Sequence, residues 1–166
     1  MILLFVTSAI ILQRLLELRL AKRNMAWALS RGAREYGADH YVLFLYLHCL
    51  WIVSFNLEWF SLRPAIPPFW GAIAVLIVAA QFLRYWAIAT LGKRWNTRIL
   101  ILQGVPKVSS GPYRYFRHPN YIAVIVEIWA VPLVIGAWYT ALFFSVLNAM
   151  LLYYIRIPAE EKALKN

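Results

Sequence analysis

Two short polar segments stand out in this 166-residue chain because their side chains could together recognise a small charged ligand. The first runs from Gly111 to Tyr121 and holds two arginines, one histidine and three tyrosines. Its Gly-Pro pair is typical of a turn. His118 precedes Pro119, which disfavours a helical conformation at the histidine and suits the first position of a helix. We therefore expect His118 at a helix N-cap, beside free backbone amides that attract an anionic group.

The composition of this first segment allows two interpretations. Arg114 and Arg117 flank the histidine with positive charge, and flat apolar faces come from Tyr113, Tyr115, Phe116 and Tyr121. This set suits a small ligand that carries a carboxylate or phosphate and an aromatic ring. It equally suits an anchor at the level of the lipid headgroups, with aromatic and basic side chains at the interface and a capping histidine.

The second segment consists of Arg156 followed by the adjacent acids Glu160 and Glu161, with Pro158 between them. A purely structural role is possible, because acids stabilise the first turn of a short helix and can pair with a nearby arginine. Alternatively, the acids attract a cationic ligand group. If the two segments meet, the site presents both signs of charge, which suits a zwitterionic or sulfonium-bearing cofactor.

The elements that must position these segments are helices in a membrane. Hydrophobic residues make up 63% of the chain and charged residues 14%, whereas soluble domains are roughly a quarter charged. This composition excludes an ordinary soluble enzyme and a disordered basic tail. A single cysteine, Cys49, excludes an internal disulfide and a multi-cysteine metal site, and we expect no metal.

The hydropathy pattern predicts one all-α, polytopic membrane domain over residues 1–166 with about five spans, each needing about 20 apolar residues. Three N-terminal spans are expected within 1–91, the first interrupted by Arg14, Glu17 and Arg19. A cytoplasmic connector follows over 92–118, with a short strand near 98–102. Residues 119–166 are expected to form a helical hairpin, 119–137 and 138–155, and a tail. The hairpin should bring the two polar segments to the same end of the molecule.

The distribution of basic residues predicts an orientation. The formal net charge is +10, and thirteen Lys and Arg residues fall on one predicted side, against Arg63 alone on the other. Because cytoplasmic loops hold the excess of Lys and Arg, we expect the N-terminus outside and the C-terminus in the cytoplasm. Topology and contact with anionic lipid explain the charge better than nucleic-acid binding does. No nucleic-acid partner is expected.

Together the two segments resemble those of the isoprenylcysteine carboxyl methyltransferase family, which is related to the membrane phospholipid methyltransferases. The resemblance rests on residues 111–114 running into 117–121, on one hydrophobic hairpin, and on Arg156 with the paired glutamates and Leu164. It covers the chain from Gly92 onward. It implies an integral-membrane enzyme that uses S-adenosylmethionine at a site on the cytoplasmic side, without a Rossmann-like methyltransferase fold.

The resemblance also implies roles for individual residues. Cofactor contact is expected from Tyr113, Arg117, His118, Pro119, Tyr121 and Glu160. The catalytic edge, which closes the pocket and places the acceptor, is expected from Arg156, Glu160 and Glu161. Further acceptor contacts are predicted at Arg84 and Glu127, because ionisable residues inside spans are candidates for function. Glu127 could instead pair with Arg84 or Gln81 and join helices, which is the interpretation that we favour.

The predicted reaction is methyl transfer to an oxygen of a lipophilic acceptor that reaches the site laterally from the lipid. A carboxylate or an acidic enol or phenol needs no general base, so an arginine that steers the anion is more useful than a base. Arg156 is the first candidate for this role, and Arg84 is the second. Two features differ from those of the family that this chain resembles. Members of that family often have a glycine at the position of Ala123, and many continue past the position of Asn166 with another helix. The acceptor therefore stays open between a prenylcysteine, an alkylpyrone or phenolic lipid, and a phospholipid. Amine N-methylation, or a non-catalytic or transport role, is the alternative.

Overall fold

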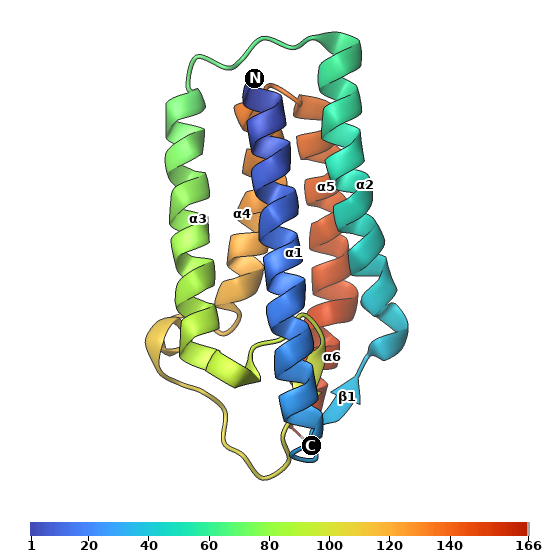
Figure 1. Cartoon of the computed structure of the whole chain (residues 1–166), viewed down its shortest axis with the longest axis vertical. Helices are drawn as coiled ribbons and strands as arrows, with labels where there is room; N and C mark the ends of the chain where they lie inside the picture. Colours follow the sequence, from blue (N-terminus) through green and yellow to red (C-terminus); the bar gives the residue numbers. More distant parts are fainter. Residues whose placement is uncertain (166) are drawn as a thin grey trace.

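Five long helices run side by side along the axis of the molecule (Figure 1). In this computed structural model, which describes residues 1–165, they are α1 Ile2–Leu29, α2 Ala38–Leu62, α3 Trp70–Leu91, α4 Pro119–Val134 and α5 Trp138–Leu151. The N-terminus lies at one end of the bundle and the chain finishes at the other (Figure 1). The prediction of an all-α fold is confirmed. Asn166, the last residue of the predicted tail, lies outside the described residues.

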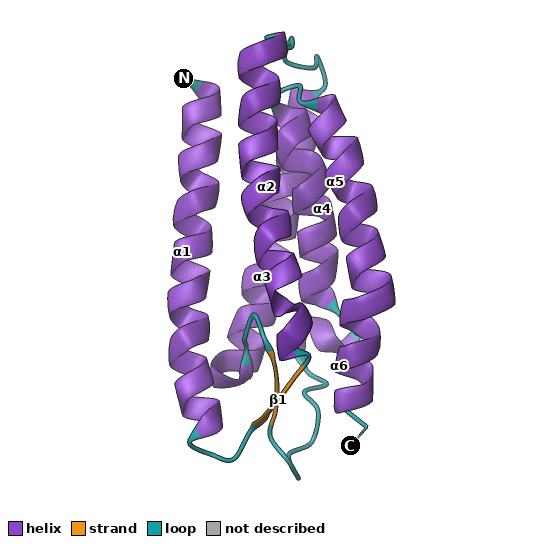
Figure 2. Cartoon of the chain, turned by 90° about the vertical axis from the view of Figure 1, so that its right-hand side faces the viewer, coloured by secondary structure: helices purple, strands orange, loops and turns teal. Residues whose placement is uncertain are grey.

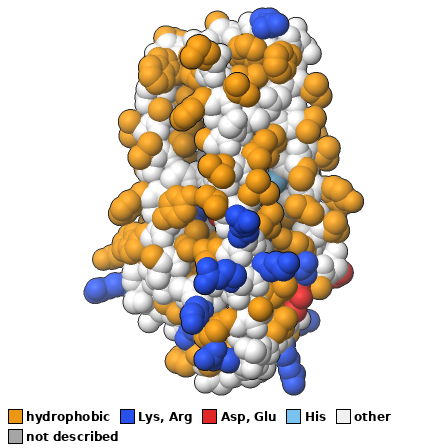
Figure 3. Space-filling view, in the orientation of Figure 1, with side chains coloured by type: hydrophobic (Ala, Val, Ile, Leu, Met, Phe, Trp, Pro, Cys, Tyr) orange, Lys and Arg blue, Asp and Glu red, His pale blue; other side chains and the backbone are white. Residues whose placement is uncertain are grey.

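Three helical segments are long and apolar enough to cross a membrane: Ala38–Leu62, Trp70–Arg94 and Trp138–Ala163. The apolar α4 has 16 residues and is shorter, and α1 carries charged residues in its middle. Both nevertheless lie alongside the other three (Figures 1 and 2). Apolar side chains cover the upper part of the surface, whereas Lys and Arg gather toward the lower end (Figure 3). The protein is an integral membrane protein, and the count of five spans and their orientation stay predictions.

Prolines precede α3 and lie in the continuation of α5. The apolar run that begins at Pro64 becomes helical only at Trp70, because Pro64, Pro67 and Pro68 lack amide donors and restrict the residues before them. The last helix does not stop near residue 155. It continues through a π-helical turn, η3 Leu152–Arg156, into α6 Ile157–Ala163, and Pro158 is tolerated because it lies in the first turn of α6.

The tight turn between α4 and α5 requires a glycine. Gly136 has a φ of 83°, and a Cβ atom there would lie 2.5 Å from the carbonyl oxygen of Ala65. Below the turn, the indole Nε1 of buried Trp51 donates to the carbonyl of Ile128 over 3.0 Å, which joins α2 to α4. Helices α4 and α5 form a hairpin, and its turn packs against the loop that precedes α3.

The connector between α3 and α4 is ordered against the lower end of the bundle. It contains the short helix η1 Gly92–Arg94, strand β2 Ile99–Ile101 and the 3-10 helix η2 Gly111–Arg114. The predicted strand is confirmed, and it pairs antiparallel with β1 Arg34–Tyr36 (Figure 2). Asn24 of α1 donates to the Trp95 carbonyl at 2.7 Å, and Asn96 donates to the Ala21 carbonyl at 2.8 Å. These two bonds hold the connector against α1.

Candidate active site

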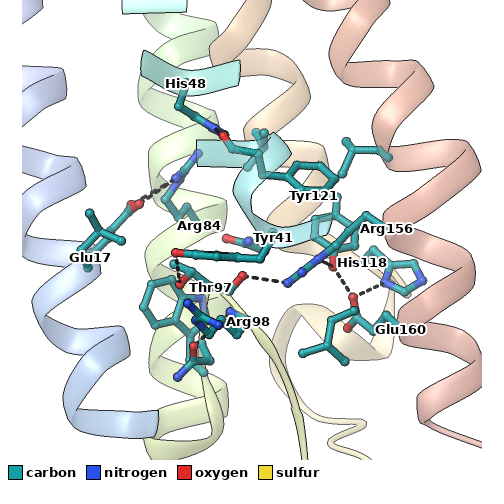
Figure 4. Close-up of a pocket in the computed structure, with 18 of the residues that line it drawn as sticks. Glu17, Tyr41, His48, Arg84, Thr97, Arg98, His118, Tyr121, Arg156 and Glu160 are labelled. Carbon is teal, nitrogen blue, oxygen red and sulfur yellow. Dashed lines mark hydrogen bonds and ion pairs between the residues drawn. The ribbon is translucent and has the colours of Figure 1, made fainter. Parts of the chain in front are cut away.

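A cavity of about 440 Å³ lies in the lower half of the bundle and is lined by residues of all five long helices and of the connector (Figure 4). Its volume is within the range of roughly 300–1,000 Å³ that is usual for small-molecule and cofactor sites. One part of its wall is polar and holds Tyr41, His118 and Arg156. Another part is apolar and includes Ile11 and Leu15 of α1 and Ile52 of α2.

The two polar segments of the sequence meet at the lower part of this cavity, as the hairpin predicts. His118 is the N-cap residue of α4, and its ring stacks on Tyr121 with 5.3 Å between ring centroids and 17° between planes. Its Nδ1 lies 3.9 Å from an oxygen of Glu160, and its Nε2 lies 3.5 Å from an oxygen of Glu161. The Tyr121 hydroxyl donates to Glu160. A base, a phenol and two acids thus form one continuous cluster. Figure 4 shows three of its members, His118, Tyr121 and Glu160.

Arg156 completes this cluster from the π-helical turn. Its Nε donates to the Tyr121 hydroxyl oxygen at 3.0 Å, and its Nη2 donates to the carbonyl of Thr97 in the connector at 2.8 Å. The guanidinium also lies 5.7 Å from the ring centroid of Phe44. Although it is a charged residue, Arg156 is buried. A π-helical turn is often found at functional sites, and here it ends at the arginine that faces the cavity.

The other predicted cofactor residues also line the cavity. Tyr113, Arg117 and Pro119 line the cavity together with His118, Tyr121 and Glu160. Burial, reinforced by the negative charge of Glu160, raises the pKa of the Tyr113 phenol above its usual range, so the phenol stays protonated.

The remaining aromatic residues of the first segment lie outside the cavity. Tyr115 is 68% exposed and Phe116 is 44% exposed, and the cavity lining includes neither these two nor Arg114. These three residues therefore lie outside the part of the segment that could contact a ligand in the cavity. Tyr115 and Phe116 suit the interfacial position that was the alternative interpretation of the segment.

Deeper in the bundle, four charged side chains form a buried network. Glu17 of α1 accepts from Arg14 at 2.7 Å and from Arg84 of α3 at 3.1 Å. Glu127 of α4 accepts from both arginines, and its other oxygen accepts from Gln81 at 3.1 Å. The two positive and two negative charges balance, as buried charges require. The favoured pairing of Glu127 with Arg84 and Gln81 is confirmed. Arg84 lines the cavity, whereas Glu127 and Glu161 are outside its lining.

Comparison with known proteins identifies the family. Residues 72–166 match the isoprenylcysteine carboxyl methyltransferase (ICMT) family. The chain belongs to this family. An uncharacterized protein of Bacillus subtilis (strain 168), YpbQ, is 40% identical over 159 residues, which cover 96% of this chain and 94% of that protein. An uncharacterized protein of Haemophilus influenzae is 28% identical over 172 residues, 100% of this chain and 97% of its own length. No solved structure matches.

Membership of the isoprenylcysteine carboxyl methyltransferase family makes this chain a membrane methyltransferase. Methyltransferases of this family generally use S-adenosylmethionine, and the cavity residues fit that group. Glu160 suits a positive sulfonium, and the N-terminus of α4 suits a carboxylate. In addition, Trp95 Nε1 and Asn120 Oδ1 are buried in residues that line the cavity and have no hydrogen-bond partner. Polar atoms in that condition leave room for bonds to a bound molecule.

Sequence reasoning missed the part of the site contributed by other segments. Tyr41, Phe44 and His48 of α2 line the cavity, as do Thr97 of the connector and Asn148 of α5. Tyr41 and Phe44 carry no recognisable pattern in an apolar helix rich in aromatic residues. Asn148 did offer a signal, because an amide in an otherwise apolar span is expected to face protein or a cavity rather than lipid.

Proposed function

We propose that this protein is an S-adenosylmethionine-dependent methyltransferase that methylates an oxygen of a lipophilic acceptor, in the manner of an isoprenylcysteine carboxyl methyltransferase. The supporting observation is that His118, Tyr121, Arg156 and Glu160 converge on one cavity whose wall continues into apolar surface. The bound cofactor would supply an electrophilic methyl group on a sulfonium. The protein then has to bind both reactants, align them and exclude water.

The cofactor side of the cavity is assigned to Tyr113, Arg117, His118, Pro119, Tyr121 and Glu160. Glu160, held by the Tyr121 hydroxyl, would face the positive sulfonium. Arg117 and the backbone amide of Asn120, in the first turn of α4, would hold a carboxylate. The stacked rings of His118 and Tyr121 supply a flat face for an aromatic ring. Each chemical part of the cofactor has a complementary partner in this set.

The acceptor side is assigned to Arg156, with Glu160 and Glu161 at the catalytic edge. A carboxylate or an acidic enol or phenol is already anionic and needs an arginine to orient it rather than a base. Arg156 is buried and held by Tyr121 and Thr97, so its guanidinium is fixed before the acceptor arrives. Glu161 lies beside His118 and would orient its ring.

Arg84 is the second candidate to contact the acceptor, since it lines the cavity on the side away from His118. Glu127 lies behind it, and we assign to Glu127 the role of a positioning residue that holds Arg84. Apolar residues of α1 and α2 line the cavity between these helices, including Ile11, Leu15 and Ile52. This is the side on which a lipid tail would lie.

We also infer five spans, with the N-terminus outside and the cavity opening to the cytoplasm. The thirteen basic residues predicted to face the cytoplasm, against Arg63 alone, support this orientation. The cofactor would then arrive from the cytoplasm and the acceptor from the surrounding lipid.

Binding of S-adenosylhomocysteine to detergent-solubilised protein tests the cofactor assignment. We expect His118→Ala and Glu160→Ala each to weaken binding at least about tenfold, which corresponds to the loss of one strong hydrogen bond or ion contact. Tyr115→Ala is the matched control, because Tyr115 belongs to the same segment and is exposed. Wild-type protein that binds neither S-adenosylmethionine nor S-adenosylhomocysteine would refute the proposal.

The acceptor class is tested by incubating membranes with a labelled methyl donor and identifying the labelled lipophilic product. Prenylcysteine analogues, phenolic lipids and phospholipid amines form the panel. We expect label on an oxygen. Transfer only to an amine would contradict the oxygen acceptor and favour phospholipid N-methylation instead.

A further inference from the structure

Among residues 1–165, most of the buried side-chain polar atoms without a hydrogen-bond partner belong to residues that line the cavity. In residues 1–165, seven buried side-chain nitrogen or oxygen atoms have no hydrogen-bond partner, and five of them belong to residues that line this cavity. Buried polar groups in proteins are normally paired. Residues with unused hydrogen-bonding capacity are therefore concentrated around the cavity, where a bound molecule could supply partners. The five are Arg14 Nε, Arg84 Nε, Trp95 Nε1, Asn120 Oδ1 and Asn148 Oδ1.

These five atoms belong to two separate parts of the cavity. Asn120 is in the first turn of α4, next to His118, and so belongs to the cofactor end, and Trp95 follows η1 in the connector at the lower end of the bundle. Asn148 lies on α5 about two helical turns before Arg156. Arg84 is held by Glu127, which lies nearly two turns beyond Tyr121 on α4. Asn148, Arg84 and Arg14, which we call the inner polar patch, therefore lie deeper in the bundle than the cofactor residues.

The charges of the inner polar patch decide which chemical group it can bind. The Nη atoms of Arg14 and Arg84 are bonded to Glu17 and Glu127, so two positive charges face two negative charges. The Nε–H donors of both arginines have no hydrogen-bond partner. Asn148 is uncharged, is 1% exposed and can both donate and accept. The patch thus offers hydrogen bonds without net charge, which suits a carbonyl or hydroxyl oxygen better than a second anion.

The wall between the two ends of the cavity is apolar. Val124 lies between Tyr121 and Glu127 on α4, and Leu152 lies between Asn148 and Arg156 on the helix opposite, and both line the cavity. A molecule that reaches from Arg156 to Asn148 therefore passes hydrocarbon walls between two polar sites. This arrangement fits an acceptor with two oxygen functions separated by a carbon segment.

We infer that the inner polar patch is a subsite for the acceptor, and that it recognises an uncharged oxygen group distinct from the oxygen that is methylated. The inference rests on the proposed function and narrows its substrate class. It assigns Asn148 as a specificity-determining residue. A lipid with a single polar head and a plain hydrocarbon tail would leave the patch unpaired, and such a lipid would bind more weakly.

Two matched series of probes test this inference: long-chain alkylphenols and long-chain fatty acids. Each series contains the unsubstituted molecule and versions in which one chain CH₂ is replaced by a ketone at successive positions. Binding to detergent-solubilised protein is measured in the presence of S-adenosylhomocysteine. In at least one series we expect one ketone position to bind about tenfold more tightly than the unsubstituted molecule, as one added hydrogen bond in a buried site would give.

Asn148→Leu should abolish this preference and leave S-adenosylhomocysteine binding unchanged. Ser145→Ala is the matched control, because the Ser145 hydroxyl is also buried and unpaired on α5 but lies outside the cavity lining. If Asn148→Leu loses S-adenosylhomocysteine binding through misfolding, the smaller Asn148→Ser takes its place. Arg84 is unsuitable for this test, since its removal would leave buried carboxylates unpaired.

The outcomes separate the two proposals. Wild-type protein that binds S-adenosylhomocysteine but prefers no ketone position in either series overturns the subsite and leaves the methyltransferase proposal standing. A preference that survives in both Asn148 variants overturns the assignment of Asn148. Wild-type protein that does not bind S-adenosylhomocysteine overturns the proposed function and the subsite with it.

Discussion

At the scale of single residues, the Tyr121 hydroxyl joins the two halves of the candidate site. It donates to Glu160, which we assign to the cofactor, and accepts from Arg156, which we assign to the acceptor. The ring of the same residue stacks on His118. One oxygen atom is therefore hydrogen-bonded to both the carboxylate of Glu160 and the guanidinium of Arg156. We propose that the relative placement of the two reactants depends on this hydroxyl.

Removing this hydroxyl tests that dependence. We expect Tyr121→Phe to lower the rate of methyl transfer about 10- to 100-fold, because hydrogen bonds to charged groups contribute about 1.5–3 kcal/mol. S-adenosylhomocysteine binding should weaken less, since the stacked ring remains. Tyr153→Phe is the control, because Tyr153 lies in the π-helical turn beside Arg156 but is 69% exposed. Equal rates for Tyr121→Phe and wild type would show that the hydroxyl orients neither reactant.

Individual site residues could be predicted where local sequence constrains the backbone. The Pro119 ring fixes the start of α4 and so places His118 at its N-cap. The contact of Arg156 with Thr97 could not be predicted in this way, because it joins the last helix to an irregular connector. Asn148 is a third kind of case. An amide in an apolar span indicates contact with protein or a cavity, but whether its side chain faces the cavity depends on how α5 packs.

At the scale of elements, the α4–α5 hairpin brings the two polar segments together, and Gly136 makes its turn possible. A side chain at Gly136 would face both an unfavourable positive φ and the Ala65 carbonyl. Because α6 continues from α5, every contact of His118 or Tyr121 with Glu160 or Glu161 depends on how α4 and α5 are aligned along each other. A strained turn would therefore affect both stability and the site.

Comparison of two glycines tests this requirement. We expect Gly136→Ala to reduce the free energy of unfolding in detergent by at least about 2 kcal/mol, from backbone strain and steric conflict. Gly71→Ala is the matched control, because a Cβ there would meet no atom within 4 Å and its φ is not positive. Alanine should leave stability at that position unchanged or slightly raised. Thermal unfolding followed by circular dichroism measures both, and similar melting temperatures would contradict the requirement for glycine.

Hydropathy was sufficient to predict the helices and the hairpin, but it could not predict the pairing of β1 with β2 at the lower end of the bundle. The apolar runs of α2, α3 and α5 are long enough to be recognised alone. Strand β1 has only three residues and pairs with β2 across a long separation in the sequence, so no local pattern reveals it. Its pairing is reinforced by the ion pair between Glu35 and Arg98, at 2.6 Å.

At the scale of the whole molecule, polar contacts rather than apolar packing alone fix α1 against the bundle. Arg14 and Glu17 reach Glu127 and Arg84 across the interior, and Asn24 holds the connector below. The same helix lines the cavity through Ile11 and Leu15. The interruption of the first apolar segment by charged residues, which weakens its hydropathy signal, thus has a structural purpose: it joins α1 to α3 and α4 beside the site.

The distribution of charge predicts how the whole molecule lies in the membrane. In a Cys49→Ser background, Ala65→Cys lies between α2 and α3, and Ser109→Cys lies in the connector after α3. With the connector in the cytoplasm, a membrane-impermeant maleimide should label Ala65→Cys in intact cells, and Ser109→Cys only after lysis. Both original side chains are exposed and uncharged, so the substitutions leave the basic residues that set the orientation unchanged. The reverse pattern would place the cavity opening outside the cell, and labelling of both from outside would contradict a membrane-spanning α3.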